Sequence, residues 1–239
     1  MEKLQPVSIN NERLPRSQSG GTLVVEQNRV LRNTYWLLAL SMLPTIAGAF
    51  AGMQFNLARV FAANPIASPL IMFGLMIGSL FVVTALRNSA WGVAALFGFT
   101  FIAGLALTPI LTYAAGFSNG GQLVGLAGGM TAVIFFSLAT IATVTKKDFS
   151  FMGKFLFIGL ILLIVAMLAN LFFQIPALSI TLSAIAVLLF SAYILYDVSR
   201  IVNGGETNYV MATMSLFLNI YNLFVHLLNL LLAFSGQRE

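Results

Sequence analysis

Cysteine is absent from the sequence, and His226 is its only histidine. The lack of cysteine excludes disulfides, thiol nucleophiles and cysteine-ligated metals. A zinc site needs several histidine or acidic ligands, and one histidine does not supply them. We therefore expect no metal and no other cofactor.

Charged residues are also scarce. They make up 8% of the 239 residues, whereas soluble domains contain about 25%. Hydrophobic residues make up 59%, and the mean hydropathy is +0.94. The Lys and Arg residues are spread over the separators between apolar stretches, so we expect no nucleic-acid partner. This composition predicts an integral protein of the lipid bilayer.

Long apolar stretches recur along the chain. A helix needs about 20 apolar residues to cross the hydrocarbon core. The separators between the stretches are short and contain turn residues. The sequence therefore predicts an all-α, polytopic bundle of seven transmembrane helices, over 33–54, 66–86, 91–114, 121–144, 154–174, 177–202 and 209–234.

The basic residues predict the orientation of this bundle, because cytoplasmic loops are enriched in Lys and Arg. A cytoplasmic N-terminus leaves only Arg59 and Arg238 on the outer side. An odd number of spans then makes the C-terminus periplasmic. The inner side would hold Lys3, Arg13, Arg16, Arg29, Arg32, Arg87, Lys146, Lys147, Lys154 and Arg200.

The first residues of the chain are polar and lack the pattern of a cleaved signal peptide. We expect residues 1–32 to form a flexible cytoplasmic tail. Residues 33–239 would then form the transmembrane domain, with the first span as an uncleaved anchor.

Two features predict how the helices pack. Gly74 and Gly78, and a glycine ridge over 121–129, favour close helix–helix approach, within the bundle rather than at an oligomer interface. Pro109 should kink the third span, and Thr108 or a neighbouring helix could then satisfy the carbonyl that loses its partner.

The last span carries a regular polar stripe. Its polar residues are spaced by three and four positions, which places them on one face of a helix. Amide side chains exposed to lipid would lack partners, so this face should point into the bundle. Interhelical hydrogen bonds and a hydrated, ion-accessible cavity are both consistent with it. The stripe consists of Ser215, Asn219, Asn222, His226 and Asn229.

Asp197 is the only acidic residue within an apolar stretch. A charge at the centre of a membrane costs about 2.5–3.5 kcal/mol on insertion scales, so such residues usually have partners or functions. Tyr193 and Arg200 share its face, and an Asp197–Arg200 pair is a candidate contact. Counting from the turn between the last two spans places Asp197 level with Asn219, and His226 deeper. We hypothesise that Asp197 is a titratable gate or latch on the cytoplasmic side.

Known intramembrane catalytic sites do not match the sequence. Aspartyl proteases need two carboxylates that share a proton, and no second acidic residue lies within a span. A rhomboid-type serine site is poorly matched by "AFSG" at the edge of the last span, and a retinal site would need a lysine inside a span. The sequence therefore predicts a protein that is not an enzyme.

Three segments resemble the Bax inhibitor family: "GLALTPIL" in the third span, "SAYILYDVSRIVNGG" at the end of the sixth and "NIYNLFVHLLNLL" in the seventh. The resemblance covers about residues 25–235 and is closest to the bacterial YccA-type branch. It implies an inner-membrane protein that associates with FtsH, a membrane-anchored AAA+ zinc protease. It further implies that the protein restrains FtsH and is its slow substrate, engaged through residues 1–32.

Other members of that family are described as pH-sensitive calcium leak channels with a latch of two aspartates. Asp197 matches the first aspartate, but Asn219 stands where the leak-type proteins carry the second. This substitution removes half of the negative charge available to attract calcium, which prefers several oxygen ligands. The alternatives to an FtsH modulator are thus a calcium or proton leak gated at Asp197, and a purely structural subunit.

Overall fold

The computed structural model describes residues 17–236, with side chains from Asn28 onward. Every regular element in this part of the chain is a helix, as the sequence predicts. In chain order the helices are α1 (Ser17–Gln54), α2 (Leu57–Ala63), α3 (Ala67–Leu86), α4 (Trp91–Ala106), α5 (Thr108–Ala115), α6 (Gly120–Thr145), the short 3-10 helix η1 (Ser150–Met152), α7 (Gly153–Phe173), α8 (Pro176–Val202) and α9 (Tyr209–Ser235).

Seven candidate membrane spans are present in residues 17–236, which confirms the predicted number. Their bounds follow the predicted stretches closely, and α4 and α5 together form the third span, Trp91–Ala115. The short helix α2 was not predicted, because its seven residues are too few to show a span-length pattern.

The first helix is longer than predicted. It begins at Ser17, so residues 17–32 of the predicted flexible tail are helical. Residues 1–16 lie outside the described part of the chain. The division into a tail and a transmembrane domain stays a prediction.

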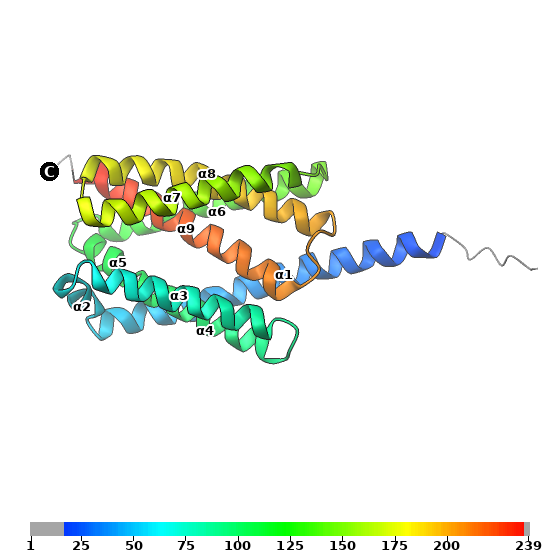
Figure 1. The fold of residues 1–239 in the computed structure, drawn as a ribbon, viewed down its shortest axis with the longest axis horizontal. Coiled ribbons are helices and arrows are strands. Elements are labelled where there is room, and N and C mark those ends of the chain that lie inside the picture. Colours follow the sequence, from blue (N-terminus) through cyan, green and yellow to red (C-terminus); the bar gives the residue numbers. More distant parts are fainter. Residues whose placement is uncertain (1–16, 237–239) are drawn as a thin grey trace, which may run out of the picture.

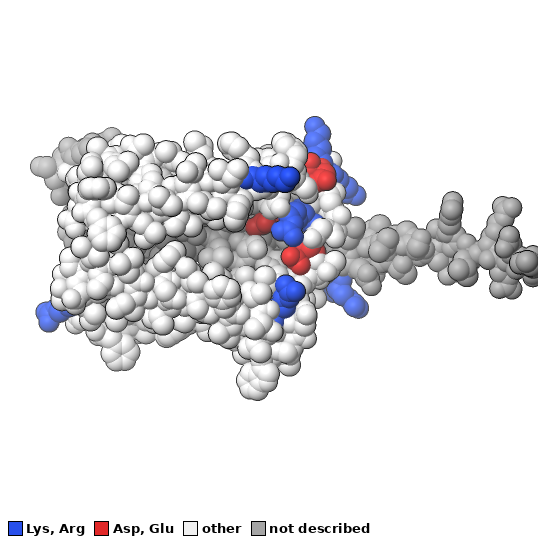
Figure 2. Space-filling model, viewed as in Figure 1, with Lys and Arg blue, Asp and Glu red and all other residues white. Residues whose placement is uncertain are grey.

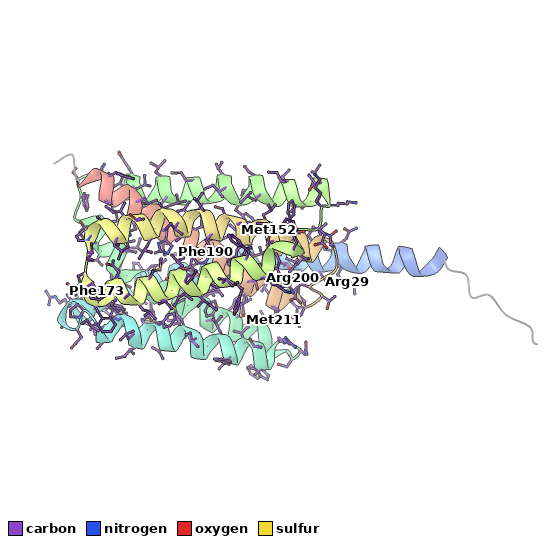
Figure 3. All side chains as sticks on the ribbon, turned by 45° about the horizontal axis from the view of Figure 1, so that its top comes forward. Arg29, Met152, Phe173, Phe190, Arg200 and Met211 are labelled. Atoms are coloured by element: carbon purple, nitrogen blue, oxygen red, sulfur yellow. The ribbon has the colours of Figure 1, made fainter. Side chains whose placement is uncertain are left out.

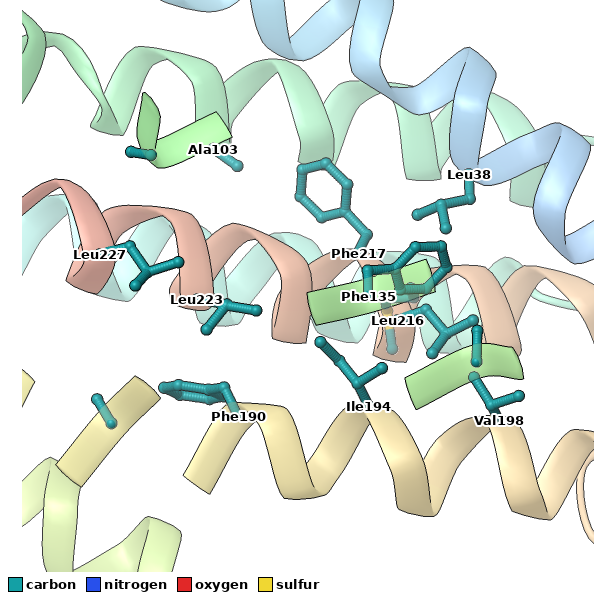
Figure 4. Close-up of a cluster of buried hydrophobic side chains, with 14 of the residues drawn as sticks. Leu38, Ala103, Phe135, Phe190, Ile194, Val198, Leu216, Phe217, Leu223 and Leu227 are labelled. Carbon is teal, nitrogen blue, oxygen red and sulfur yellow. The ribbon is translucent and has the colours of Figure 1, made fainter. Parts of the chain in front are cut away.

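Helix α9 lies at the centre of the bundle (Figure 1). It contacts α1, α3, α4, α5, α6 and α8, and side chains along it are fully buried, including Leu216, Leu223 and Leu228. Figure 4 shows Leu216 and Phe217 of α9 among Leu38 of α1 and Val198 of α8. In contrast, α3 and α7 lie at the perimeter and bury few side chains, so most of their apolar surface is left for lipid.

Pro109 interrupts the third span as predicted. Helix α4 ends at Ala106 and α5 begins at Thr108. Because proline has no N–H, the carbonyl of Leu105 loses its usual helical partner. The Thr108 hydroxyl donates a hydrogen bond to that carbonyl oxygen at 2.8 Å, so the break leaves this group satisfied.

The glycines predicted to allow close helix approach within the bundle are not the ones that do so. Methyl groups added at Gly74, Gly78 or the ridge glycines Gly121, Gly125 and Gly129 would meet no atom within 4 Å. The glycine ridge lies on the side of α6 opposite its packed face, whose buried residues include Leu123, Ala127 and Thr131.

Close helix approach occurs instead between α1 and α4. A methyl group at Gly48 would overlap the carbonyl oxygen of Phe101, and one at Gly104 would overlap that of Thr45. The two backbones therefore touch at paired glycines, the arrangement expected where van der Waals packing drives association in lipid.

Basic residues gather at one end of the bundle (Figure 2). We call this end the basic end; among the described residues it carries Arg29, Arg32, Arg87, Lys146, Lys147, Lys154 and Arg200. Figure 3 shows Arg29 and Arg200 at this end and Phe173 at the other. Arg59 belongs to α2, which lies at the opposite end of the bundle (Figure 1).

The α1–α4 contact predicts opposite effects for two glycine substitutions. Gly48→Ala should lower the free energy of unfolding by about 1–3 kcal/mol, because the added methyl group overpacks the interface. Gly125→Ala, in open space, should leave stability unchanged or raise it by up to about 1 kcal/mol through helix propensity. Denaturant-induced unfolding in micelles, followed by circular dichroism, measures both. Equal stability of the two variants would contradict the assigned interface.

Candidate functional site

The centre of the candidate site is a hydrogen bond between Asp197 on α8 and Asn219 on α9. The Asn219 amide Nδ2 donates to the Asp197 carboxylate Oδ2 at 2.7 Å. Each residue is only 7% exposed. The structure thus brings together the buried carboxylate and the amide that the sequence places at the same depth.

The turn between α8 and α9 sets this register. Gly204 has a positive φ of 77°, and the amides of Gly204 and Gly205 donate to the carbonyls of Ile201 and Arg200. This is a Schellman end, which needs a residue that tolerates the left-handed conformation. Asn208 then caps α9 by accepting hydrogen bonds from the amides of Val210 and Met211.

Arg200 does not pair with Asp197, so the candidate ion pair was wrong. Its guanidinium lies 3.7 Å from the Glu206 carboxylate and 5.6 Å from the centre of the Tyr196 ring. The physical reason is the tight turn after α8, which folds Glu206 back over the end of the helix. Arg200 and Glu206 remain partly exposed at the basic end.

Tyr193 lies one helical turn before Asp197 on α8 and is half-buried. Its ring packs edge-on against Tyr196, with centroids 6.4 Å apart, and lies 6.4 Å from the Phe190 ring. These aromatic rings form part of the surroundings of Asp197 on its own helix.

A second group of contacts at the basic end was not predicted. The buried Ser199 hydroxyl donates to the carbonyl of Lys147 at 2.9 Å and accepts from the amide of Phe149 at 3.1 Å. Asn203 also donates to the Lys147 carbonyl, at 3.3 Å. These bonds join the loop after α6 to the end of α8. The polar residues Ser199 and Asn203 in "DVSRIVNGG" were the only sequence signal for these hydrogen bonds.

The exposed loop residue Asp148 is fixed locally. Its carboxylate accepts a hydrogen bond from the Ser150 amide at 2.8 Å. Hydrogen bonds from the side chain and backbone of Ser150 hold the pKa of Asp148 below its usual value. This carboxylate therefore stays ionised beside the lysines of the loop at neutral pH.

The deeper polar residues of α9 form a separate cluster. Asn229 donates to the Ser183 hydroxyl at 2.8 Å, and His226 Nδ1 lies 3.3 Å from the same oxygen. The His226 ring also stacks on Phe190, with centroids 6.1 Å apart. A cavity of about 350 Å³ adjoins this cluster between α7, α8 and α9. As the sequence indicates, His226 has a partner other than Asp197.

The two other residues of the stripe, Asn222 and Ser215, contribute less to contacts between helices. Asn222 donates to the carbonyl of Leu218 on its own helix, at 2.8 Å. Ser215 is half-buried, and among the described residues no hydrogen bond of its side chain is found. The stripe therefore makes interhelical hydrogen bonds at Asn219 and at the His226–Asn229 cluster, rather than along its whole length.

An apolar layer separates the two polar clusters. Phe190 and Ile194 of α8 point toward Leu223 of α9 in Figure 4, and all three are buried. From Asn219 to His226, α9 rises about 10 Å. The interhelical hydrogen bonds of the stripe thus form two clusters, and the apolar side chains of Phe190, Ile194 and Leu223 lie between them.

The sequence is similar to a known family and to several individual proteins. Residues 27–236 match the model of the family described as "Inhibitor of apoptosis-promoting Bax1". The match covers all seven candidate spans.

Individual relatives are similar over nearly their whole length. An uncharacterised protein of Pseudomonas aeruginosa is 42% identical over 86% of this chain and 89% of its own. A protein of Escherichia coli K12 named "Modulator of FtsH protease YccA" is 37% identical over 92% of this chain and 97% of its own. The equivalent protein of Escherichia coli O6:H1 is named "Inner membrane protein YccA".

The Asp197–Asn219 contact can be tested by a double-mutant cycle. Asp197→Leu and Asn219→Leu should each lower the free energy of unfolding by about 1–3 kcal/mol, because each leaves a buried polar partner unsatisfied. The double variant should lose less than the sum, with a coupling of about 1 kcal/mol. Asp197→Leu combined with Asn229→Leu is the control and should be additive. Additive losses in both cycles would contradict the contact.

Proposed function

The chain belongs to the Bax inhibitor family, and from that premise we propose that it is a membrane-embedded modulator of the FtsH protease. It is a multi-span protein of the inner membrane. The observation that carries the proposal is the likeness to the FtsH modulator of Escherichia coli over 92% of the chain. We propose that it acts without catalysis of its own, as an inhibitor and slow substrate of the FtsH complex.

The proposed orientation places the basic end in the cytoplasm. Seven basic residues of residues 17–236 lie at this end, and Arg59 lies at the other. Cytoplasmic loops carry such an excess of Lys and Arg. With this orientation the N-terminal segment that precedes α1 lies on the cytoplasmic side, where it can serve as the handle for an ATP-driven protease.

The packing of α1 supports slow extraction of the chain by a protease that pulls on this N-terminal segment. A protease pulling on the N-terminus must first remove α1 from the bundle. This helix buries Thr34, Leu37, Leu38 and Ser41, and its backbone touches α4 at Gly48. The Thr213 hydroxyl of α9 also donates to the Thr34 carbonyl, at 3.3 Å.

Removal of α1 would break the hydrogen bond between Thr213 and Thr34 and the close backbone packing between α1 and α4. Such packing is a main source of helix association in lipid. We propose that this resistance keeps FtsH occupied and so slows its action on other membrane proteins.

Two variants test this proposal in cells. Deletion of residues 2–16 should slow degradation of the chain by FtsH, because the handle is lost. Gly48→Ala should speed degradation, because α1 is easier to remove. Pulse-chase half-lives in strains with and without active FtsH measure both effects, and the half-life of a second FtsH membrane substrate reports inhibition.

Gly125→Ala is the matched control and should retain the wild-type half-life. Overproduction of the wild-type chain should lengthen the half-life of the second substrate, and Gly48→Ala should do so less. An unchanged half-life of that substrate at every expression level would contradict the proposed inhibition.

One observation favours a second candidate function, an ion leak. Asp197 is a buried carboxylate in a span, and such residues often mark proton or ion pathways. It lies on the basic-end side of the apolar layer, while the His226 cluster and its cavity lie on the other side. A leak would therefore require Phe190, Ile194 and Leu223 to separate.

Flux measurements distinguish this candidate from the modulator. Liposomes containing the purified chain should show no more calcium or proton flux than protein-free liposomes if the modulator is the whole function. A flux that Asp197→Asn abolishes or makes insensitive to pH would establish the leak instead.

A further inference from the structure

A long apolar groove runs between α1 and α6, away from the Asp197 site. Its volume is about 840 Å³. Both helices pack on α9, and Phe217, Ile220 and Phe224 of α9 form its floor. The groove is open on its outer side, where Ile46 is 65% exposed and Phe136 is 65% exposed. In a membrane this opening faces lipid.

Among the described residues, the basic side chains that adjoin the groove lie at one of its ends. Tyr35 on α1 and Thr143 on α6 mark the end of the groove that is nearest the basic end. Arg32 precedes Tyr35 by three positions and so continues the same face of α1. Lys146 directly follows α6. Both side chains are exposed.

The loop that carries Lys146 is held in place by hydrogen bonds. The carbonyl of Lys147 accepts hydrogen bonds from Ser199 and Asn203, and the amide of Lys146 donates to the carbonyl of Ala142. Asp148 is the acidic residue of this loop, and with Arg29, Arg32, Lys146 and Lys147 nearby the charge at this end is positive.

The groove begins at the basic end and does not cross the whole hydrocarbon core. Its lining covers a rise of about 16 Å along α1, from Tyr35 to Ile46, and about 24 Å along α6, from Val144 to Gly128, whereas the full core is about 30 Å thick. A transmembrane helix of a partner would span the full core, whereas an acyl chain reaches from the interface to the middle. Cations at the interface and an apolar groove below them together match one amphipathic molecule.

We propose that this groove binds an anionic phospholipid of the leaflet at the basic end. The phosphate group lies near Arg32 and Lys146, and one acyl chain lies along α1 and α6 over the α9 floor. The cations give preference over zwitterionic lipids, because each Lys or Arg near the surface contributes about 1 kcal/mol toward an anionic headgroup. The buried Tyr35 hydroxyl lies at the same end.

Native mass spectrometry of the full chain tests the proposal. The delipidated protein in micelles is titrated with dioleoylphosphatidylglycerol, dioleoylphosphatidylcholine or both. The wild type should bind one phosphatidylglycerol in preference to phosphatidylcholine. Arg32→Gln with Lys146→Gln should weaken phosphatidylglycerol binding about tenfold or more and leave phosphatidylcholine binding unchanged.

Matched variants distinguish lipid binding in the groove from lipid binding elsewhere on the surface. Arg87→Gln with Lys154→Gln removes the same charge from the basic end and should retain wild-type preference. Thr140→Phe places a ring in the groove, whereas Ile141→Phe places it on an exposed face of α6 that does not line the groove. Thr140→Phe should weaken binding of both lipids, and Ile141→Phe should not.

Three outcomes would overturn the proposal. The first is equal loss of preference in the two double-charge variants, which indicates non-specific attraction to the basic end. The second is wild-type lipid binding by Thr140→Phe. The third is a photo-crosslink from residue 140 in native membranes to another protein's transmembrane helix and not to lipid.

Discussion

The constraint on which this structure depends is that a polar group inside a membrane must find its partner within the protein. Helix α9 carries Asn219, Asn222, His226 and Asn229 within one span, so it lies where other helices surround it. Each of these residues has a hydrogen-bonding partner: Asp197, the Leu218 carbonyl or the Ser183 hydroxyl. The apolar helices α3 and α7 need no such partners and lie outside.

The same constraint explains which features the sequence could predict. The seven spans follow from hydropathy, and the break at Pro109 follows from a missing N–H with a hydroxyl beside it. The pairing of Asp197 with Asn219 could be anticipated because a short turn fixes the depth of both residues. All three depend on local sequence or on one adjacent connection.

The remaining features depend on contacts between segments far apart in the chain. Glycine spacing marks α6 as clearly as it marks α1, and only packing selects Gly48 and Gly104 as the close contact. The partner of Arg200 depends on how the loop folds back, which brings Glu206 to it. The bonds from Ser199 to the Lys147 loop join residues about 50 positions apart and have no periodic signal.

Helix α1 connects the proposed functions. In the proposed function the segment before α1 offers the protease a handle, while the packed side of α1 resists removal. A third side forms one wall of the apolar groove, so a bound lipid would lie between α1 and α6 without displacing α9. In the proposed function, retention of α1 in the bundle is the physical basis of slow degradation and so of inhibition.

The most direct test of this account is affinity isolation of the full chain from native inner membranes, with FtsH quantified by mass spectrometry. The account predicts that FtsH co-purifies with the wild type and also with a chain lacking residues 2–16, which binds but is degraded slowly. Recovery of FtsH no greater than from membranes that lack the chain would contradict it.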